Sequence, residues 1–426
     1  MIRALAGSRM LRLFSSAVID QAMLSATNFI VGLLLIRNAS DQDYGHYVLA
    51  FSTLLLVTSF QGSLIGGPLA VLAPKRDAEA KRVMVASLHR RLRQFSNRLT
   101  PVVLALLAVA TVAVPLNWEY ALLGAAFVIT THTAIEREYL RSSLMLYSRP
   151  QAVLAVDAVY SAVLLVGAFA AVLLVKPAAP ATIGAIALAS VAGSWAARRS
   201  FGRSPGWASE DAPTALKEIL VLGYWAAVGS VIYWICNYGY NYVTAMKLDV
   251  ATVAAIAATR LLLMPVNLLT AGVKSLLMPT AATWYNELGM RELVRRMLFF
   301  TFGLLVLMGL YDGLLWVLRD WVIDVVLKKN IADRDALIGL WILVFFIAVV
   351  RDQLQTVLLI RERFKSLAWV AAGSAVFSLS FSWWAMDHYG MVGAVMGLVA
   401  GELLNLIGTA VLTVRQVRAD LAAERA

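Results

Sequence analysis

The sequence predicts an all-α integral membrane protein of about 12 transmembrane helices, arranged as two pseudo-symmetric lobes of six helices each. Three observations support this fold class. Of the 426 residues, 60% are hydrophobic and 15% are charged, whereas soluble domains carry about 25% charged residues. Apolar runs long enough to cross a bilayer follow one another along the whole chain. Polar residues at the ends of some of these runs recur half a chain apart.

The membrane spans are predicted from the length of the apolar runs, because a helix needs about 20 apolar residues to cross the hydrocarbon core. The boundary between the third and fourth spans is the least marked, since only Asn117, Trp118 and Glu119 divide them. In the second span, three glycines and a proline between Gly62 and Pro68 predict close helix packing or a bend. The runs lie near residues 13–36, 46–73, 100–116, 119–136, 151–175, 180–197, 218–245, 251–283, 297–318, 336–360, 366–386 and 391–414.

The distribution of Lys and Arg predicts the orientation of the chain. An even number of spans places both termini on one side of the membrane. If that side is the cytoplasm, 27 of the 37 Lys and Arg residues are cytoplasmic, 7 are outside and the remaining three lie within spans. This asymmetry is the positive-inside pattern. It also accounts for the net charge of +11 without a nucleic-acid partner.

The sequence lacks the residue patterns that mark common catalytic or metal sites. It has four His and one Cys, and it contains no HExxH, CxxC, GxSxG or P-loop pattern. We therefore expect no metal, no cofactor and no enzymatic activity. The longest predicted loop, 74–99, is too short for a catalytic domain. Its segment 77–98 places apolar residues on one helical face among basic ones, which fits either a helix on the anionic inner leaflet or an ordinary cytoplasmic loop.

An internal repeat predicts two lobes, residues 1–205 and 206–426. The fourth span ends in Arg137-Glu138 and the tenth in Arg351-Asp352, 214 positions later, and the residues that follow agree in register. Because each half holds six spans, both halves enter the membrane from the same side. Transporters built from such parallel repeats bind their substrate between the halves and rock them to alternate access.

Three cations within the spans are candidate substrate ligands. A charge inside a membrane costs at least a few kcal/mol and usually faces a cavity or a partner. Arg260 lies about 14 Å from the outer end of the eighth span, and its guanidinium suits either a phosphate or an ion pair with Glu402. Lys274 falls on nearly the same face, where it either contacts a phosphate at the inner mouth or reaches the inner headgroups. Arg351 is the third candidate.

Acids within the spans are candidates for coupling to a proton or Na⁺ gradient. Each of them is also a candidate for a hydrogen bond between packed helices. On the first span, Gln21 and Asn28 share a face that suits contacts with sugar hydroxyls. The acidic candidates are Asp20, Asp157, Asp312, Asp352 and Glu402.

Taken together, these residues resemble those of a known family. An acidic-Tyr-Gly turn beginning at Asp43 follows the first span, Arg260-Leu precedes a proline in the eighth, and Tyr389-Gly390 opens the twelfth. With the matching ends of spans four and ten, the sequence resembles the polysaccharide-export and lipid-linked-oligosaccharide flippase branch of the multidrug/oligosaccharidyl-lipid/polysaccharide (MOP) exporter superfamily. The resemblance implies a V-shaped cavity between the lobes and contact of Arg260 with substrate phosphates. Lipid II flippases of this superfamily have fourteen spans and cations in the first two, whereas the first span here carries Asp20.

The function that this resemblance implies is a flippase of the bacterial inner membrane. Its substrate would be a polyprenyl-pyrophosphate-linked oligosaccharide repeat unit, and membrane lipids, a polysaccharide polymerase and glycosyltransferases are the expected partners. A cation-coupled multidrug exporter of the same superfamily is the nearest alternative, but a cationic drug favours an acidic pocket. A membrane glycosyltransferase, polymerase or ligase is the alternative from another class, and such an enzyme is expected to carry a larger outer loop.

Overall fold

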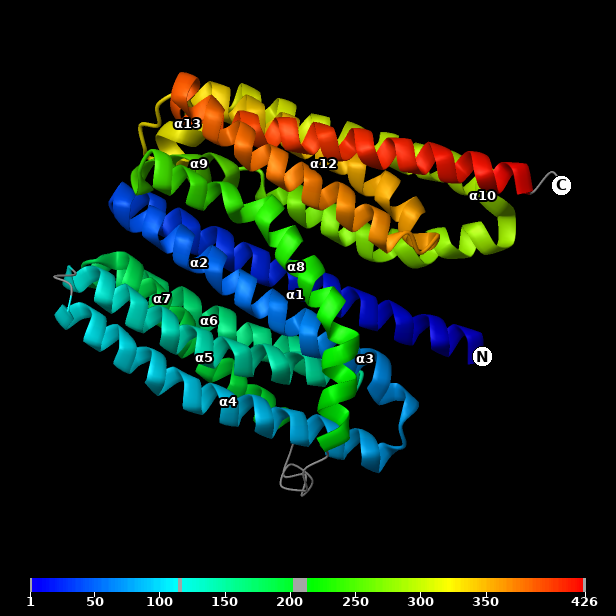
Figure 1. The fold of residues 1–426 in the computed structure, drawn as a ribbon, viewed down its shortest axis with the longest axis horizontal. Helices are drawn as coiled ribbons and strands as arrows, with labels where there is room; N and C mark the ends of the chain where they lie inside the picture. The colour runs from blue at the N-terminus through cyan, green and yellow to red at the C-terminus, as the bar shows by residue number, and fades with distance from the viewer. Residues whose placement is uncertain (1, 114–116, 202–212, 424–426) are drawn as a thin grey trace. The chain divides into compact units, whose positions relative to one another are not determined.

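A computed structural model describes residues 2–113, 117–201 and 213–423. Within these ranges it does not describe the side chains of 2–18, 213–215, 271, 274–276, 279 and 423. The described residues contain helices and turns and no β-strand. They divide into two compact units, Met1–Val231 and Ile232–Ala426 (Figure 1). The predicted lobe boundary at 205/206 falls outside the described residues and stays a prediction, as does the V-shaped cavity.

The first unit is built around four helices that pack closely on one another. Side chains of α7 are the most buried of the candidate spans, and this helix packs against both α5 and α6, while α6 also packs against α1. Asn117 caps α5 by accepting a hydrogen bond from the Glu119 amide. The elements are α1 (Ile2–Asn38), α2 (Asp41–Gln61), a π-helical turn η1 (Gly62–Gly66), α3 (Gly67–Leu72), a 3₁₀ turn η2 (Ala73–Lys75), α4 (Ala78–Ala113), α5 (Trp118–Leu146), α6 (Pro150–Leu174), α7 (Ala178–Phe201) and the first part of α8 (Pro213–Lys247).

The second span contains a local irregularity where the sequence predicted close packing or a bend. Pro68 has no N–H to offer the carbonyl four residues earlier, at Leu64, and the chain forms the π-helical turn η1 here. A Cβ placed on Gly62 would have no heavy atom within 4 Å, so this glycine does not mark a close approach between helices. The close approach comes instead from Gly223 of α8, where a Cβ would lie 2.1 Å from the Leu64 carbonyl oxygen.

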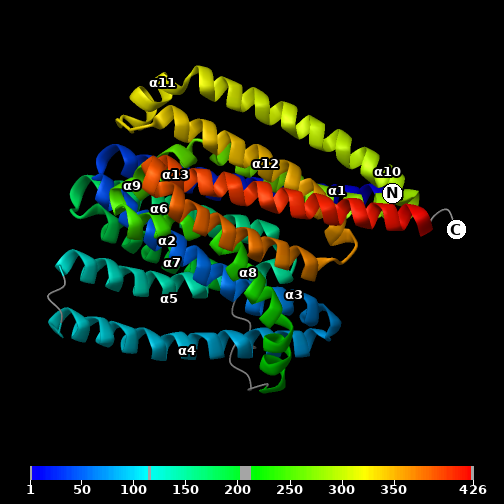
Figure 2. The same ribbon diagram turned by 45° about the horizontal axis from the view of Figure 1, so that its top comes forward.

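The sequence allowed either a helix or a loop for 77–98, and residues 78–98 are helical. They form the N-terminal part of α4, which continues without a break to Ala113 and runs beside α5 (Figures 1 and 2). Met84, Val85 and Leu88 are buried against Tyr139 of α5 and Leu69 of α3. Protein therefore covers part of the apolar face that was expected to meet the inner leaflet or solvent, while Phe95 on the same face is 64% exposed.

The second unit contains the remainder of α8 and five predicted spans. Two of its long helices each comprise two helices that meet at a glycine with positive φ, Gly289 (φ 79°) and Gly390 (φ 53°). Such backbone angles favour glycine because it has no Cβ. The elements are α9 (Val250–Leu261), α10 (Met264–Val317), α11 (Arg319–Trp321), the π-helical turn η4 (Val322–Leu327), α12 (Arg334–Ile360) and α13 (Phe364–Ala423).

The eighth span is broken near its middle. Residues Val250–Leu261 and Met264–Thr270 meet at an angle of 53°. Pro265 in the first turn of α10 cannot donate to the Leu261 carbonyl, which ends the regular hydrogen-bond ladder of α9. The hydroxyl of Tyr311, from the second half of α10, donates to the Leu262 carbonyl at 2.6 Å. A side chain of the ninth span thus satisfies a backbone group that the break leaves without a helical partner.

The structure confirms an all-helical membrane protein. Nine helices in the described ranges are long and apolar enough to cross a membrane, or ten if the bent eighth span is counted. One of the nine, α13, bends at Gly390 and holds two predicted spans. The helix α5 corresponds to the predicted fourth span, but it carries several charged residues and is not one of these nine helices. The described residues of each predicted apolar run therefore lie in one or more helical elements, apart from a few residues at the ends of runs and the break at Leu262 and Leu263.

The contact between Gly223 and Leu64 generates a prediction about stability. In Gly223→Ala the new Cβ meets a backbone oxygen, which cannot rotate away, so α8 or η1 must shift at a cost of about 1–3 kcal/mol. We expect a lower thermal unfolding temperature for the detergent-purified variant than for the wild type. Gly229→Ala on the same helix is the matched control, because nothing lies within 4 Å of its Cβ position. Equal unfolding temperatures for the two variants would contradict the contact.

Candidate functional site

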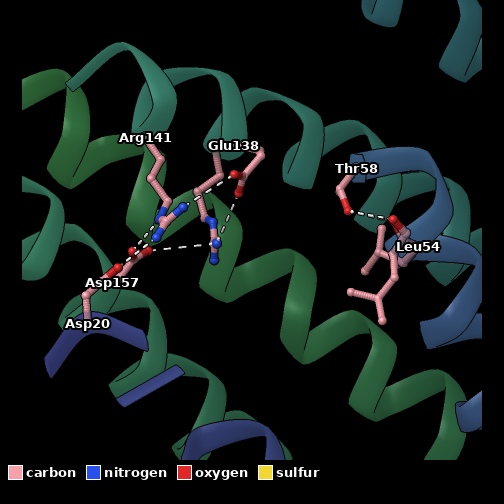
Figure 3. A network of polar contacts seen from close by, with 8 residues as sticks. Asp20, Leu54, Thr58, Glu138, Arg141 and Asp157 are labelled. Carbon is pink, nitrogen blue, oxygen red and sulfur yellow. Dashed lines mark hydrogen bonds and ion pairs between the residues drawn. The ribbon is translucent and has the colours of Figure 1, made fainter. Parts of the chain in front are cut away.

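A cluster of five charged side chains lies inside the first unit. It joins three helices, α1, α5 and α6, and Figure 3 shows the acids converging on the guanidinium of Arg141. We call it the N-unit charge cluster. It consists of Asp20, Arg137, Glu138, Arg141 and Asp157.

Arg141 is the centre of the N-unit charge cluster. Its Nη2 donates to Asp20 Oδ2 at 2.7 Å, its Nε donates to Asp157 Oδ2, and its Nη1 lies 3.5 Å from Glu138 Oε1. Arg137 supports the same acids, with Nη2 3.8 Å from Asp157 Oδ1 and 3.6 Å from Glu138 Oε2. Asp20 and Asp157 are almost fully buried, so these pairs lie in a medium where each charge depends strongly on its partner.

Sequence reasoning missed Arg141 and treated the acids separately. The signal was present, because Arg141 follows Arg137 by four residues and Glu138 by three, which places all three on one face of a helix. The structure leaves Gln21 exposed and Asn28 half-buried on α1. Their role in sugar contacts stays a prediction.

The second unit contains a smaller cluster at the position equivalent by the internal repeat. Arg351 of α12 donates to Asp352 Oδ1 through Nη2 at 2.8 Å and through Nε at 3.1 Å, and its Nη1 donates to Glu402 Oε2 of α13. We call these three residues the C-unit charge cluster. The Arg–acid pairs that the repeat aligned form corresponding ion pairs in both units. Glu402 pairs with Arg351, not with Arg260 as the sequence had allowed.

Arg260 occupies a different kind of site, which we call the Arg260 site. It lies in the last turn of α9, directly before the break in the eighth span. Its Nη1 donates to the Asn237 carbonyl at 2.9 Å and to the Tyr240 hydroxyl at 3.2 Å. Its guanidinium carbon lies 5.1 Å from the ring centroid of Tyr238, 5.8 Å from that of Tyr240 and 5.3 Å from that of Trp341. Aromatic faces thus stabilise the cation.

The donors of Arg260 that remain unused define what the site can bind. Within the described part of the chain, no carboxylate pairs with Arg260, and its Nε and Nη2 make no hydrogen bond. These two nitrogens form one edge of the planar guanidinium. That edge matches two oxygens of a phosphate or carboxylate, the bidentate geometry that a lysine ammonium cannot reproduce.

The Arg260 site and the C-unit charge cluster belong to one polar region of the second unit. The hydroxyl of Tyr233 on α8 interacts electrostatically with Asp352, Arg260 and Arg351, and Glu402 interacts with Arg260. The two cations and the two acids of this region, Asp352 and Glu402, balance in formal charge, but both acids contact Arg351, so Arg260 is the cation without a direct carboxylate contact in the described residues. Broken helices often mark binding sites in membrane transporters, and Arg260 lies at such a break.

Two sequence candidates lie apart from these clusters. Lys274 belongs to α10, but its side chain is outside the described residues. Asp312, also on α10, is 3% exposed, and neither of its carboxylate oxygens has a hydrogen-bond partner in the described residues. No group of three or more His, Cys, Asp or Glu side chains suited to a metal occurs in the same part of the chain.

The N-unit charge cluster predicts a large loss of stability when its central cation is removed. Arg141→Ala leaves Asp20 and Asp157 buried without their main partner, at a cost of about 3–5 kcal/mol. Arg295→Ala is the control, because the Arg295 side chain is exposed to solvent and exposed ion pairs add little to stability. Chemical unfolding of the purified variants measures the difference. If Arg141→Ala is no less stable than Arg295→Ala, the cluster does not hold the three helices together.

No protein-family model matches the sequence, and no curated protein matches it either. An inward-facing multidrug resistance MATE family transporter of the MOP superfamily has a TM-score of 0.74 at 13% identity, over 94% of this chain and 95% of that one. A MOP superfamily transporter from Pyrococcus furiosus Vc1, described as having a binding pocket of reverse polarity, has a TM-score of 0.67 at 12% identity, over 96% of both chains.

A lipid II flippase, MurJ, in an inward closed conformation has a TM-score of 0.67 at 12% identity, over 93% of this chain and 86% of that one. These similarities cover nearly the whole chain. At such low identity they show that the chain has the fold shared by these membrane transporters. The fold that the sequence resemblance implied is therefore confirmed, whereas the polysaccharide-export branch is not distinguished from the others.

Proposed function

We propose that this protein is a flippase that moves a polyprenyl-pyrophosphate-linked oligosaccharide repeat unit from the inner to the outer leaflet. Transport proceeds by alternating access and is driven by a proton or Na⁺ gradient. The observation that carries the proposal is the free edge of Arg260, a cation within a span that makes no direct contact with a carboxylate in the described residues. The pyrophosphate of the substrate would accept hydrogen bonds from this edge.

The surroundings of Arg260 suit a glycolipid with a charged linkage. Tyr238, Tyr240 and Trp341 hold the guanidinium from the protein side, so its orientation is set before a ligand arrives. Preorganisation of this kind lowers the entropic cost of binding. We assign Lys274 and Arg351 supporting roles along the path of the phosphates. Gln21 and Asn28 are proposed contacts for the sugar hydroxyls.

The coupling ion is assigned to the acids within the spans. Asp20 and Asp157 in the first unit, and Asp352 and Glu402 in the second, are paired with arginines, so an ion that binds them must compete with a guanidinium. Asp312 meets no such competition in the described residues. We place the protein in the bacterial inner membrane with both termini in the cytoplasm. A polymerase and glycosyltransferases that act on the same lipid are its proposed partners.

A cation-coupled multidrug exporter is the second candidate function. It is favoured by the likeness to MATE family transporters and by the N-unit charge cluster, where three acids face two arginines. A membrane glycosyltransferase, polymerase or ligase has no comparable support, because the similar structures named above are transporters and a flippase.

Substitution of Arg260 tests the proposed function. We expect Arg260→Ala to weaken binding of a polyprenyl pyrophosphate in lipid nanodiscs by roughly 10- to 100-fold, because a hydrogen bond to a charged group contributes about 1.5–3 kcal/mol. Arg260→Lys should restore the charge but only part of the affinity, since it lacks the two-nitrogen edge. Arg295→Ala, an exposed cytoplasmic arginine in the predicted topology, is the control. Normal binding and normal polymer export by a well-inserted Arg260→Ala protein would rule out the phosphate-anchor role.

A dye-efflux assay separates the two transport functions. Cells that express the protein should not export a lipophilic cation such as ethidium faster than cells that carry an empty vector, because Arg260 repels a cationic ligand. Efflux of the dye that is lost in Asp20→Asn and retained in Arg260→Ala would instead support the multidrug exporter.

A further inference from the structure

Asp312 differs from the other acids in the spans of the described chain. It lies on the second half of α10, in the predicted ninth span, and its side chain is 3% exposed. Neither carboxylate oxygen has a hydrogen-bond partner in the described residues. By contrast, acids elsewhere in the spans contact cationic side chains; these are Asp20, Glu136, Glu138, Asp157, Asp352 and Glu402.

An isolated carboxylate at this position is strongly disfavoured. Removing an ionised carboxyl from water without a partner costs many kcal/mol, so such a group takes up a proton and becomes neutral. The neutral acid needs far less compensation than the charged form. Burial and isolation together therefore make Asp312 a site whose natural ligand is a proton.

The elements packed around Asp312 offer little competition for that proton. A Cβ placed on Gly309 would lie 3.7 Å from the Phe346 ring, and one on Gly339 would lie 3.7 Å from the Trp316 ring. Residue 312 therefore lies beside the middle of α12, and Figure 2 shows the two helices side by side. The facing stretch 336–350 has no ionisable side chain. The charged residues of α12 lie outside this stretch: Arg334, Asp335, Arg351 and Asp352.

The neighbouring parts of α10 and α9 add two ionisable side chains, Tyr311 and Arg260. Tyr311 precedes Asp312 on α10 and interacts with it electrostatically. On α9, the ionisable side chain is Arg260, whose contacts are with Asn237 and with aromatic side chains of α8 and α12. A change of charge at Asp312 is therefore felt first by Tyr311.

Tyr311 connects Asp312 to the broken eighth span. Its hydroxyl donates to the carbonyl of Leu262 at 2.6 Å, and Leu262 lies in the break two residues after Arg260. A negative charge on Asp312 repels the partial negative charge of the Leu262 carbonyl oxygen, which is the acceptor of the neighbouring phenol. It also attracts water into the packed interface. Either effect loosens the hydrogen bond that supports the break, and hence the backbone that positions Arg260.

We propose that Asp312 is the proton-binding site that couples an ion gradient to the break in the eighth span. The protonated acid stabilises the packing of α10 against α12 and the Tyr311–Leu262 hydrogen bond, and loss of the proton favours a conformation that hydrates Asp312. Asp312 lies five residues before the end of α10 at Val317, which is about 8 Å along the helix. In the predicted orientation this end faces outward, so the proton enters from the outer side. The coupling role rests on the proposed transport function, whereas proton binding by Asp312 does not.

Infrared spectroscopy of the full protein in lipid nanodiscs tests the proton site directly. At neutral pH we expect the carbonyl stretch of a protonated carboxyl, with an isotope shift in heavy water, that is lost in Asp312→Asn. The control is Asp352→Asn, which removes an acid of the same type paired with Arg351 and should leave the band unchanged. Absence of a band that depends on Asp312 overturns the proposal. A band that disappears when Na⁺ is added at constant pH also overturns it, in favour of a sodium site.

The link to the eighth span is tested with Tyr311→Phe, which removes the hydroxyl and keeps the ring. We expect the infrared band of Asp312 to persist, while the pH dependence of polyprenyl pyrophosphate binding, present in the wild type, is lost. Unchanged pH dependence in Tyr311→Phe overturns the link through Leu262. If the band is present but no variant binds a polyprenyl pyrophosphate, the proton site stands and the proposed substrate is wrong.

Discussion

The pairing of charges in a medium of low dielectric constant is the constraint on which this structure depends. A guanidinium or carboxylate that leaves water loses its hydration, and only a partner of opposite charge with good hydrogen-bond geometry compensates that loss. Arg141 and Arg351 meet the requirement through acids on neighbouring helices and, for Arg351, also through Asp352 of its own helix. Through these pairs, helices that are distant in the sequence are held in one arrangement within each unit.

The same constraint makes the exceptions informative. Arg260 has aromatic and carbonyl neighbours but no carboxylate in the described part of the chain, and Asp312 has no hydrogen-bonded partner there. One is a cation with unused donors, and the other is an acid without a donor. Both lie in the second unit, and the hydrogen bond from Tyr311 to Leu262 connects their surroundings. A site that binds an anion and a site that binds a proton are thus related through a single break in a helix.

Much of the fold could be predicted from the sequence, because the thickness of a bilayer fixes how long an apolar run must be. The described residues of the twelve runs are helical apart from a few at the ends of runs and the break at Leu262 and Leu263. Arg137-Glu138 and Arg351-Asp352, which the repeat aligned, form similar ion pairs. For the segment 77–98 the sequence left a helix on the inner leaflet and a loop as alternatives, because periodicity does not tell whether protein or lipid covers an apolar face.

The candidate site was less predictable, since its contacts depend on how the helices rotate about their axes. The sequence identified Arg260 as a buried cation but not its aromatic surroundings, which come from α8 and α12. It allowed Glu402 as the partner of Arg260, yet the structure pairs Glu402 with Arg351. The role of Arg141 could not be predicted, because the three acids that contact it lie on three different helices and come from separate stretches of the sequence.

The convergence of several acids on Arg141 also has an evolutionary consequence. Because one guanidinium pairs with Asp20, Glu138 and Asp157 together, a substitution at one position of the cluster leaves a charge at another position without its partner. A lineage that replaces Arg141 must first, or at the same time, neutralise two buried acids on different helices. We therefore expect these positions to covary among homologues, and a chain that has lost all of them should still build the same helices around an apolar core. The cluster would then be a feature of this lineage that its fold does not require.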